Sequence, residues 1–231
     1  MKIISNEAAA FRYERKFIVE QMEPSQVYAL IKLHPAFFYE PYPPRYINNI
    51  YLDTPDMKYY EENVSGVKDR RKVRIRWYGE LFGHAQKPTL ELKIKDGLVG
   101  RKVSCPFPAF DLDKSFSFKY FQKILKTPSL KPEYSYFLRD HIPVLVNRYY
   151  RWYFATVDGR FRVTLDINMS YYNIRSLHNI FLYHYENRHN FIVELKYGID
   201  QDTSAAQVVN HFPFSLTKNS KYVQGIDNVL Y

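Results

Sequence analysis

Apolar and charged residues alternate along five segments of the chain, with the period of two that is typical of β-strands. In Asp69–Tyr78 the apolar residues are Val73, Ile75 and Trp77, and they alternate with Lys72, Arg74 and Arg76. The same alternation predicts strands over Ala10–Glu20, Thr89–Lys95, Phe161–Met169 and Phe191–Tyr197. Less regular patterns predict further strands over Arg45–Asp53, Val99–Cys105 and Val144–Phe154. We therefore expect about eight strands, most of them with one apolar and one ionic face.

Helical spacing and helix start signals separate these strands. They predict helices over Ser25–His34, Asp56–Asn63, Phe116–Lys126, Pro132–His141 and Ser204–His211, and one more near the C-terminus. The apolar stripes of such helices need a surface to pack against, and the apolar faces of the strands provide one. The sequence thus predicts an α+β fold in which helices cover the apolar side of a sheet.

The ionic faces of the strands allow two interpretations. A single strand of this kind is most often part of an antiparallel sheet with one face on the core and the other in water. Here, however, each face carries two or three ions in E-x-K and R-x-R spacings, with both signs mixed. If the sheet closes into a barrel with its apolar side outward, the ions collect in a central cavity. Cations confined in this way repel one another strongly, so such a cavity requires an anionic ligand such as phosphate.

Composition limits the possible classes of protein. With 231 residues, we expect one domain over residues 1–231. Only 8 glycines are present and no GxxxxGK[ST] motif occurs, which argues against a glycine-rich phosphate loop. The single cysteine, Cys105, excludes a disulfide framework and is typical of a reducing compartment. We find no secretory signal and no apolar run long enough for a transmembrane segment, so we expect a cytoplasmic protein.

The net charge of +9 indicates an anionic partner. Nucleic acid, a membrane surface, a nucleotide and polyphosphate all fit that charge. We expect no nucleic-acid binding, because the informative ions are in register with strands, whereas an exposed basic patch needs no such alternation.

Several motifs, in this order, resemble those of one family. They are R-Y-E-R-K-F at Arg12–Phe17, Y-L-D-T-P-D at Tyr51–Asp56, R-K-V-R-I-R-W-Y-G at Arg71–Gly79, L-E-L-K-I-K at Leu90–Lys95, N-R-Y-Y-R at Asn147–Arg151, R-V-T-L-D at Arg162–Asp166, V-E-L-K at Val193–Lys196 and K-N-S-K at Lys218–Lys221. Nearly the whole chain resembles the VTC catalytic domain, the polyphosphate polymerase branch of the CYTH-like triphosphate tunnel enzymes. The resemblance implies an eight-stranded antiparallel β-barrel, the triphosphate tunnel fold, with helices packed on the outside.

The resemblance also implies roles for individual residues. The tunnel walls would bind phosphate and carry the catalysis through Lys16, Arg74, Arg76, Lys93, Arg151, Arg162 and Lys196. Further substrate contacts would come from Arg12, Tyr149, Lys218, Ser220 and Lys221. A divalent cation, Mn²⁺ or Mg²⁺, would bind Glu194, with Glu14 as a further ligand, and Glu91 and Asp166 are secondary candidates for the metal or for pairing with arginines. The implied reaction transfers a phosphoryl group from ATP or another nucleoside triphosphate to a growing polyphosphate chain.

One departure separates this chain from hydrolytic members of the wider superfamily. Those members usually begin with E-x-E-x-K, whereas here the first position is Arg12. The lost carboxylate gives a more cationic tunnel and favours a polymerase over a triphosphatase, although hydrolysis by the same fold stays an alternative. A non-catalytic polyphosphate-binding module is a second alternative. The acceptor, the oligomeric state and any association with a separate membrane protein stay open.

Overall fold

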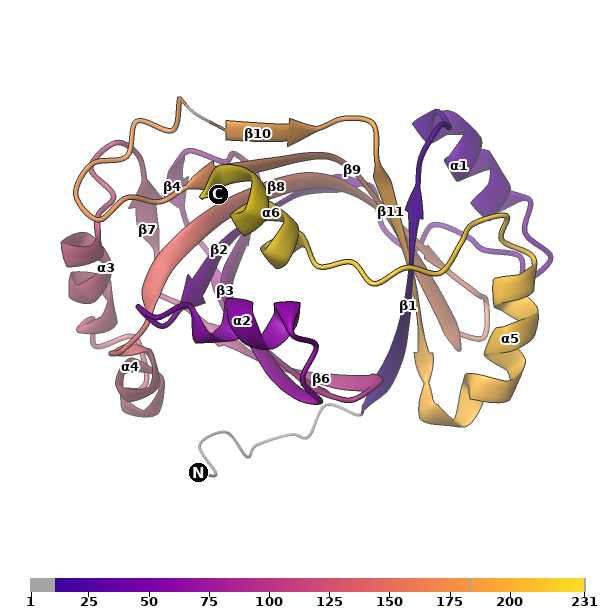
Figure 1. Ribbon diagram of the computed structural model, residues 1–231, viewed down its shortest axis with the longest axis horizontal. Coiled ribbons are helices and arrows are strands. Elements are labelled where there is room, and N and C mark those ends of the chain that lie inside the picture. Colours follow the sequence, from indigo (N-terminus) through magenta and orange to yellow (C-terminus); the bar gives the residue numbers. More distant parts are fainter. Residues whose placement is uncertain (1–10, 183, 231) are drawn as a thin grey trace.

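The computed structural model describes residues 11–182 and 184–230. Eight strands form a closed antiparallel ring in the order β1-β6-β5-β3-β2-β8-β9-β11 and back to β1, and a ninth, β10, extends the sheet beside β9 (Figure 1). The ring strands are β1 (Arg12–Val19), β2 (Arg45–Asp53), β3 (Asp69–Tyr78), β5 (Thr89–Asp96), β6 (Val99–Pro106), β8 (Ile142–Ala155), β9 (Phe161–Asn173) and β11 (Phe191–Gly198). The predicted α+β fold and eight-stranded antiparallel barrel are confirmed.

Three short strands were not predicted from the sequence. These are β4 (Gly83–Ala85), β7 (Phe110–Leu112) and β10 (His184–Asn187); β4 and β7 pair with each other outside the ring. The helices are α1 (Pro24–Lys32), α2 (Lys58–Val64), α3 (Phe118–Leu125), α4 (Pro132–Leu138), α5 (Asp202–Asn210) and α6 (Lys221–Val229), and a 3₁₀ turn, η1 (Ile199–Gln201), precedes α5. All six predicted helices are present, with ends that differ from the prediction by a few residues.

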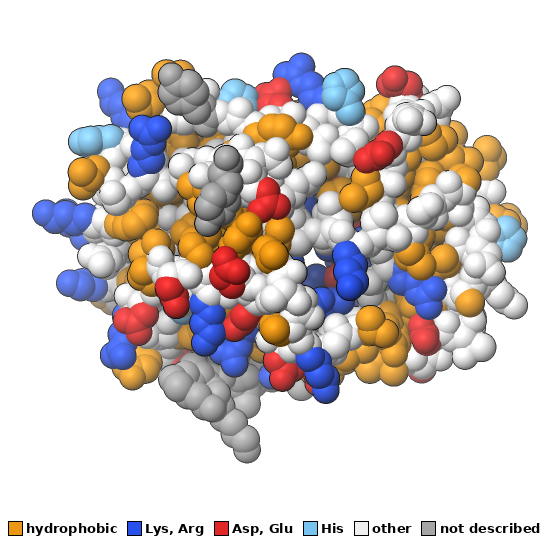
Figure 2. Space-filling model, in the orientation of Figure 1, with side chains coloured by type: hydrophobic (Ala, Val, Ile, Leu, Met, Phe, Trp, Pro, Cys, Tyr) orange, Lys and Arg blue, Asp and Glu red, His pale blue; other side chains and the backbone are white. Residues whose placement is uncertain are grey.

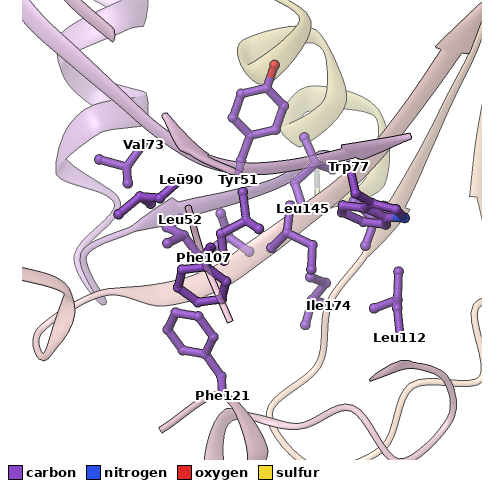
Figure 3. Packing of buried hydrophobic residues seen from close by; sticks show 14 of the residues in the cluster. Tyr51, Leu52, Val73, Trp77, Leu90, Phe107, Leu112, Phe121, Leu145 and Ile174 are labelled. Carbon is purple, nitrogen blue, oxygen red and sulfur yellow. The ribbon is translucent and has the colours of Figure 1, made fainter. Parts of the chain in front are cut away.

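The apolar faces of the strands point outward, and two hydrophobic clusters cover them. On β3, β5 and β2, residues such as Val73, Leu90 and Leu52 pack against α3, α4 and the segment around β7. Figure 3 shows Phe107 facing Phe121 of α3, with ring centroids 6.5 Å apart. The second cluster joins the outward residues of β1, β9 and β11 to α1 and α5. Burying each large apolar side chain contributes about 1.5–3 kcal/mol, so these clusters hold the ring with its ionic face inward.

Helices α2 and α6 lie at one opening of the ring instead of on its outer wall (Figure 1). Helix α6 packs against β8 and β9 so closely that a Cβ atom on Gly225 would lie 2.5 Å from side-chain carbons of both Leu145 and Tyr171. A glycine is required at this contact. The C-terminal helix therefore covers part of the opening and brings its first residues to the interior.

Asp53, at the end of β2, connects both of these helices to the ring. Its buried carboxylate accepts hydrogen bonds from the backbone N–H groups of Tyr59 and Tyr60, each at 2.9 Å, and from the hydroxyl of Tyr222 in α6. The Asp53 carboxylate thus accepts hydrogen bonds from backbone N–H groups in the first turn of α2, which have no partner within the helix, and it positions α6 beside α2.

Asn168 marks an irregularity in the wall of the ring. The register between β8 and β9 shifts between Arg148 and Tyr150, and Asn168 on β9 has a φ of 50° at the corresponding place. The register shift identifies a β-bulge, and asparagine tolerates the left-handed conformation there better than most residues.

No helix in the described residues is long and apolar enough to cross a membrane.

Candidate functional site in the tunnel

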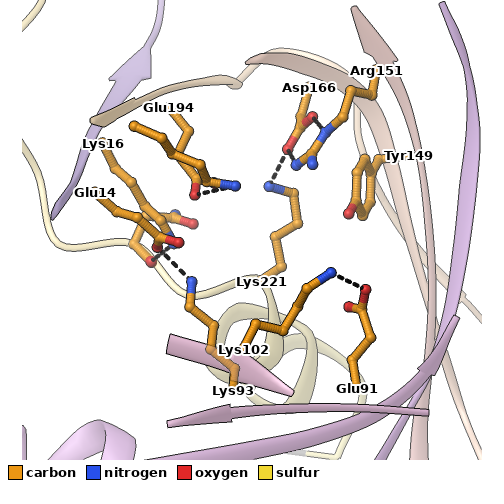
Figure 4. A network of polar contacts seen from close by, with 12 residues as sticks. Glu14, Lys16, Glu91, Lys93, Lys102, Tyr149, Arg151, Asp166, Glu194 and Lys221 are labelled. Atoms are coloured by element: carbon orange, nitrogen blue, oxygen red, sulfur yellow. Dashed lines mark hydrogen bonds and ion pairs between the residues drawn. The ribbon is translucent and has the colours of Figure 1, made fainter. Parts of the chain in front are cut away.

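The inner face of the ring carries the ions that the sequence pattern predicts to lie together. Cross-strand neighbours share a face of a sheet, and the register places Lys16 opposite Glu194, Arg74 opposite Glu91, and Arg151 opposite Asp166. Figure 4 shows five of these six side chains, those of Lys16, Glu194, Glu91, Arg151 and Asp166, pointing into one interior space from different strands. The barrel is therefore ionic inside and apolar outside.

Asp166 is the centre of a buried ion cluster. Its carboxylate accepts hydrogen bonds from Arg151 Nε at 2.5 Å and Nη2 at 2.7 Å, and it lies 2.5 Å from the Nζ atom of Lys221 at the start of α6. Burial alone would raise the pKa of Asp166, but the charges of Arg151 and Lys221 outweigh it and lower the pKa to about 2. The carboxylate is thus ionised, and it holds both cations in place.

Glu91 has the same function for a second group of cations. Its oxygens lie 2.6 Å from Arg74 Nη2, 2.6 Å from Lys102 Nζ and 3.6 Å from Arg76 Nη1. Arg76 also donates hydrogen bonds to Asn49 Oδ1 at 3.1 Å and to the hydroxyl of Tyr149 at 3.2 Å. Burial opposes the charge on Glu91, but Arg74 and the other two cations keep its pKa below the ordinary value.

Tyr149 lies between these two clusters. The Cζ atom of Arg151 is 5.0 Å from the centre of its ring, and the Nζ atom of Lys221 is 4.8 Å away. Burial would raise the pKa of Tyr149, yet the charges of Arg151 and Arg76 lower it to about 8. The hydroxyl group is therefore a strong hydrogen-bond donor toward an anion in the tunnel.

Glu14 and Glu194 form an acidic pair on β1 and β11. Lys93 Nζ lies 2.5 Å from Glu14, and Lys196 Nζ lies 3.1 Å from Glu194. Burial and the Glu194 carboxylate raise the pKa of Glu14, but Lys93, Lys196 and Lys16 outweigh them, and its pKa is below the ordinary value. For Glu194 the same lysines outweigh burial, and its pKa lies well below the ordinary value. Both carboxylates are ionised.

A cavity of about 980 Å³ opens between β1, β3, β5, α2 and the segment before α6. Seven cationic side chains line it, Lys16, Lys68, Arg70, Lys72, Lys93, Lys95 and Lys218, and two carboxylates, Glu14 and Asp227. Such an excess of positive charge in a confined space attracts anions and concentrates their field lines.

Two lysines of the cavity donate to uncharged oxygens. Lys16 Nζ donates to the backbone oxygen of Asn219 at 2.9 Å, and Lys72 Nζ donates to the hydroxyl of Ser220 at 2.8 Å. Burial lowers the pKa of Lys16 to about 8. Burial and the charges of Lys16 and Lys93 lower the pKa of Lys72 well below its ordinary value. Among the described residues, neither lysine forms an ion pair with a carboxylate as Arg74 and Arg151 do, and a phosphate group between them and Ser220 would supply a direct partner.

Most of the residues that the resemblance implies come together in this space. Those that line the tunnel or its cavity are Glu14, Lys16, Arg74, Arg76, Lys93, Tyr149, Arg151, Glu194, Lys196, Ser220 and Lys221. Lys218 is exposed at the mouth of the cavity. Arg12 and Arg162 are also exposed, and neither is among the residues that line the cavity. Burial and the charge of Arg12 lower the pKa of Arg162, so the two guanidinium groups lie near each other.

Lys72 and Lys102 also belong to the site, although neither was predicted as a site residue from the sequence. Lys72, Arg74 and Arg76 are alternate residues of β3, so their side chains lie on the same face of the strand. This alternation was the feature of the sequence that could have placed Lys72 inside the ring. Lys102 gives no comparable signal, because β6 carries few apolar residues and alternates weakly. The sequence left open whether Glu91 and Asp166 bind the metal or pair with arginines. In the structure Glu91 pairs with Arg74, and Asp166 pairs with Arg151.

The carboxylates of Glu14 and Glu194 fit a divalent cation only in part. They are ionised hard oxygen donors on neighbouring strands and face the same space. Among residues 11–182 and 184–230, no group of three or more His, Cys, Asp or Glu side chains is arranged to hold a metal ion. Mg²⁺ is commonly held by one or two carboxylates together with phosphate oxygens of a substrate. The site therefore fits a metal ion that arrives with phosphate.

Comparisons with known proteins agree with this geometry. The family model of the VTC domain matches residues 11–230. A Vibrio parahaemolyticus protein described as a candidate adenylate cyclase has the same fold, with a TM-score of 0.53 and 13% identity over 94% of this chain and 98% of its own. A Hippeastrum protein, described as a candidate adenylyl cyclase with a dominant triphosphatase activity, gives a TM-score of 0.52 and 12% identity over 96% of this chain and 97% of its own. A search of the curated proteins finds no match.

Proposed function

Because the chain belongs to the VTC domain family, we propose that it is a metal-dependent phosphotransferase that uses a nucleoside triphosphate, ATP in the first instance, to lengthen inorganic polyphosphate. The observation that carries the proposal is the cavity with seven cationic and two acidic side chains, which adjoins the ion clusters of the tunnel. A linear polyanion fits this arrangement because cations follow one another from the mouth, at Lys16 and Lys72, to Arg74, Arg76 and Arg151 inside.

The inner arginines are suited to hold phosphoryl oxygens. Phosphoryl transfer needs little covalent help from the protein, and depends on positioning and on stabilisation of the charge on the phosphoryl oxygens. Glu91 fixes Arg74 by a hydrogen bond of 2.7 Å to its Nε atom, and Asp166 fixes Arg151 through two. Arginine presents a planar set of donors that grips two oxygens at once, so such fixed guanidinium groups bind a transferring phosphate with defined geometry.

Glu14 and Glu194 would hold Mn²⁺ or Mg²⁺ together with the phosphate oxygens. The ion, when bound, would supply positive charge that stabilises the negative charge of the phosphate groups. Lys16, Lys93 and Lys196 surround the same carboxylates and keep them ionised.

We place the reaction in the cytoplasm. The half-buried Cys105 fits the reducing environment of that compartment.

The test is incubation of the purified protein with ATP and Mn²⁺ or Mg²⁺, with polyphosphate and free phosphate both measured. We expect metal-dependent formation of polyphosphate. Replacement Glu194→Gln is expected to abolish turnover while binding of polyphosphate persists, because the variant loses a metal ligand but no cation. The matched control Glu186→Gln changes an exposed glutamate on β10 that pairs with Arg188, and it should leave turnover unchanged.

Hydrolysis is the second candidate. The same residues would transfer the phosphoryl group to water, and the triphosphatase activity described for the Hippeastrum protein of the same fold motivates the measurement. Free phosphate without polyphosphate would assign the protein to this activity. Tight binding of polyphosphate that weakens with salt, with neither product under any metal, would contradict both activities and identify a binding module.

A further inference from the structure

A row of lysines occupies one edge of the molecule, around α3. Residues 114–131 contain five lysines and no aspartate or glutamate, and all five are exposed: Lys114, Lys119, Lys123, Lys126 and Lys131. Helix α3 buries Phe121, Ile124 and Leu125 on its opposite side. Figure 2 shows blue side chains along the left edge of the molecule, where Figure 1 places α3. We call these five residues the lysine row.

Three large apolar side chains are exposed in the loop between β9 and β10. Leu177 is 73% exposed, Ile180 is 69% exposed and Leu182 is 71% exposed. Their neighbour Phe181 points the other way, with its ring 5.1 Å from that of Phe82. The loop thus uses one aromatic residue as an anchor and leaves three aliphatic residues in solvent, where they cost free energy without a partner.

Hydrogen bonds hold this apolar loop against the lysine row. The backbone N–H of Phe118, at the start of α3, donates to the oxygen of Ser176 at 3.1 Å. The buried side chain of Asn179 donates to the backbone oxygen of Phe116 at 2.6 Å, and its N–H donates to the oxygen of Lys114 at 3.3 Å. The loop is therefore held beside the first part of the lysine row and the start of α3. The residues that line the tunnel cavity belong to other segments.

We propose that this surface docks on an anionic lipid bilayer, with the aliphatic side chains of the loop in the headgroup and acyl region and the lysines on the lipid phosphates. Interfacial binding combines buried apolar area with attraction between basic residues and anionic lipids, and the two parts of this surface supply one each. A nucleic acid would use the lysines but would leave Leu177, Ile180 and Leu182 in water. The proposal is independent of the activity in the tunnel.

The test is co-sedimentation of the full chain with phosphatidylcholine vesicles, with and without phosphatidylserine. We expect binding only with phosphatidylserine, and weaker binding at higher salt. The variant Leu177→Ser/Ile180→Ser/Leu182→Ser and the variant Lys119→Gln/Lys123→Gln should each lower the vesicle affinity by roughly tenfold or more. Circular dichroism and thermal unfolding would show that the variants stay folded.

Matched controls separate this surface from the general positive charge of the protein. Lys32→Gln/Lys58→Gln removes the same charge elsewhere, and Val157→Ser alters an apolar side chain that is 85% exposed in the turn between β8 and β9. Both controls should bind vesicles like the wild type. Equal losses in control and test variants, no preference for phosphatidylserine, or release of the vesicles by tripolyphosphate at a concentration that fills the tunnel would overturn the proposal.

Discussion

Replacing Lys16 with methionine tests whether the tunnel stores uncompensated positive charge. Burial lowers the pKa of Lys16 from 10.5 to about 8, and each pKa unit corresponds to about 1.4 kcal/mol. Keeping this side chain charged therefore costs the folded protein roughly 3 kcal/mol by this relation. Because Lys16 borders the open cavity, solvent screening reduces the cost to about 1–3 kcal/mol. Lys16→Met keeps the apolar stem and removes the charge, so the unliganded variant should be more stable.

The measurement is thermal unfolding followed by calorimetry at pH 7. A gain of this size raises the Tm of a chain of this length by roughly 2–12 °C. Tripolyphosphate should raise the Tm of the wild type more than that of the variant, because phosphate supplies the counter-charge only where Lys16 is present. The control Lys58→Met, which changes an exposed lysine at the start of α2, should shift the Tm only slightly.

The pH dependence fixes the sign of the effect. A lysine with a lowered pKa destabilises the folded state fully below about pH 8, and the penalty disappears as the pH rises toward 10.5, the ordinary value. The advantage of Lys16→Met over the wild type should therefore shrink between these two pH values. A variant that is less stable than the wild type at pH 7, or an advantage that does not change with pH, would refute the reasoning.

Three further predictions concern the same buried ions. Asp166→Asn leaves Arg151 and Lys221 without their counter-charge. We expect it to lower the free energy of unfolding, measured in urea, by about 3–5 kcal/mol. The control Glu186→Gln, on the exposed β10, should lower it by less than about 1 kcal/mol. Asp53→Asn weakens the acceptor that joins α2 and α6 to β2, and it should cost about 1–3 kcal/mol in the same assay; an unchanged urea midpoint would contradict the proposed connection. Titration calorimetry should show that the affinity for tripolyphosphate falls as the pH rises above about 8 and Lys16 loses its proton, and that Lys16→Met weakens this dependence; an equal fall in both proteins would assign it to another group.

Five of the eight ring strands, β1, β3, β5, β9 and β11, could be predicted because apolar and ionic residues alternate along them. In β3, Val73 and Ile75 are buried outside the ring, and Arg74 between them points inward, as the period of two requires. Strands β4, β7 and β10 have only three or four residues each, which is too short for any period to show. Their pairing depends on the surrounding packing, which the sequence alone does not define.

The candidate site could be predicted only up to the direction of each side chain. The alternation along a strand indicates which side chains point into the ring, but the register between strands decides how deep in the tunnel each side chain lies. Arg12 and Arg162 are at inward positions of the alternation and still lie exposed. Lys72 has the same position in the alternation and lines the cavity. The position of α6 depends on the close contact at Gly225, which leaves no periodic signal.

Glu91 and Asp166 serve the tunnel as permanent counterions. When an open basic surface binds a polyanion, each phosphate that a cation neutralises releases counterions from the polyanion, so the affinity depends steeply on ionic strength. Here part of that neutralisation is covalently built into the wall, since each of these carboxylates contacts two or more cations. If the proposed function holds, a polyanion that enters the tunnel meets fewer unpaired cations than the number of basic residues suggests, and its affinity depends on the salt concentration less steeply than that number implies.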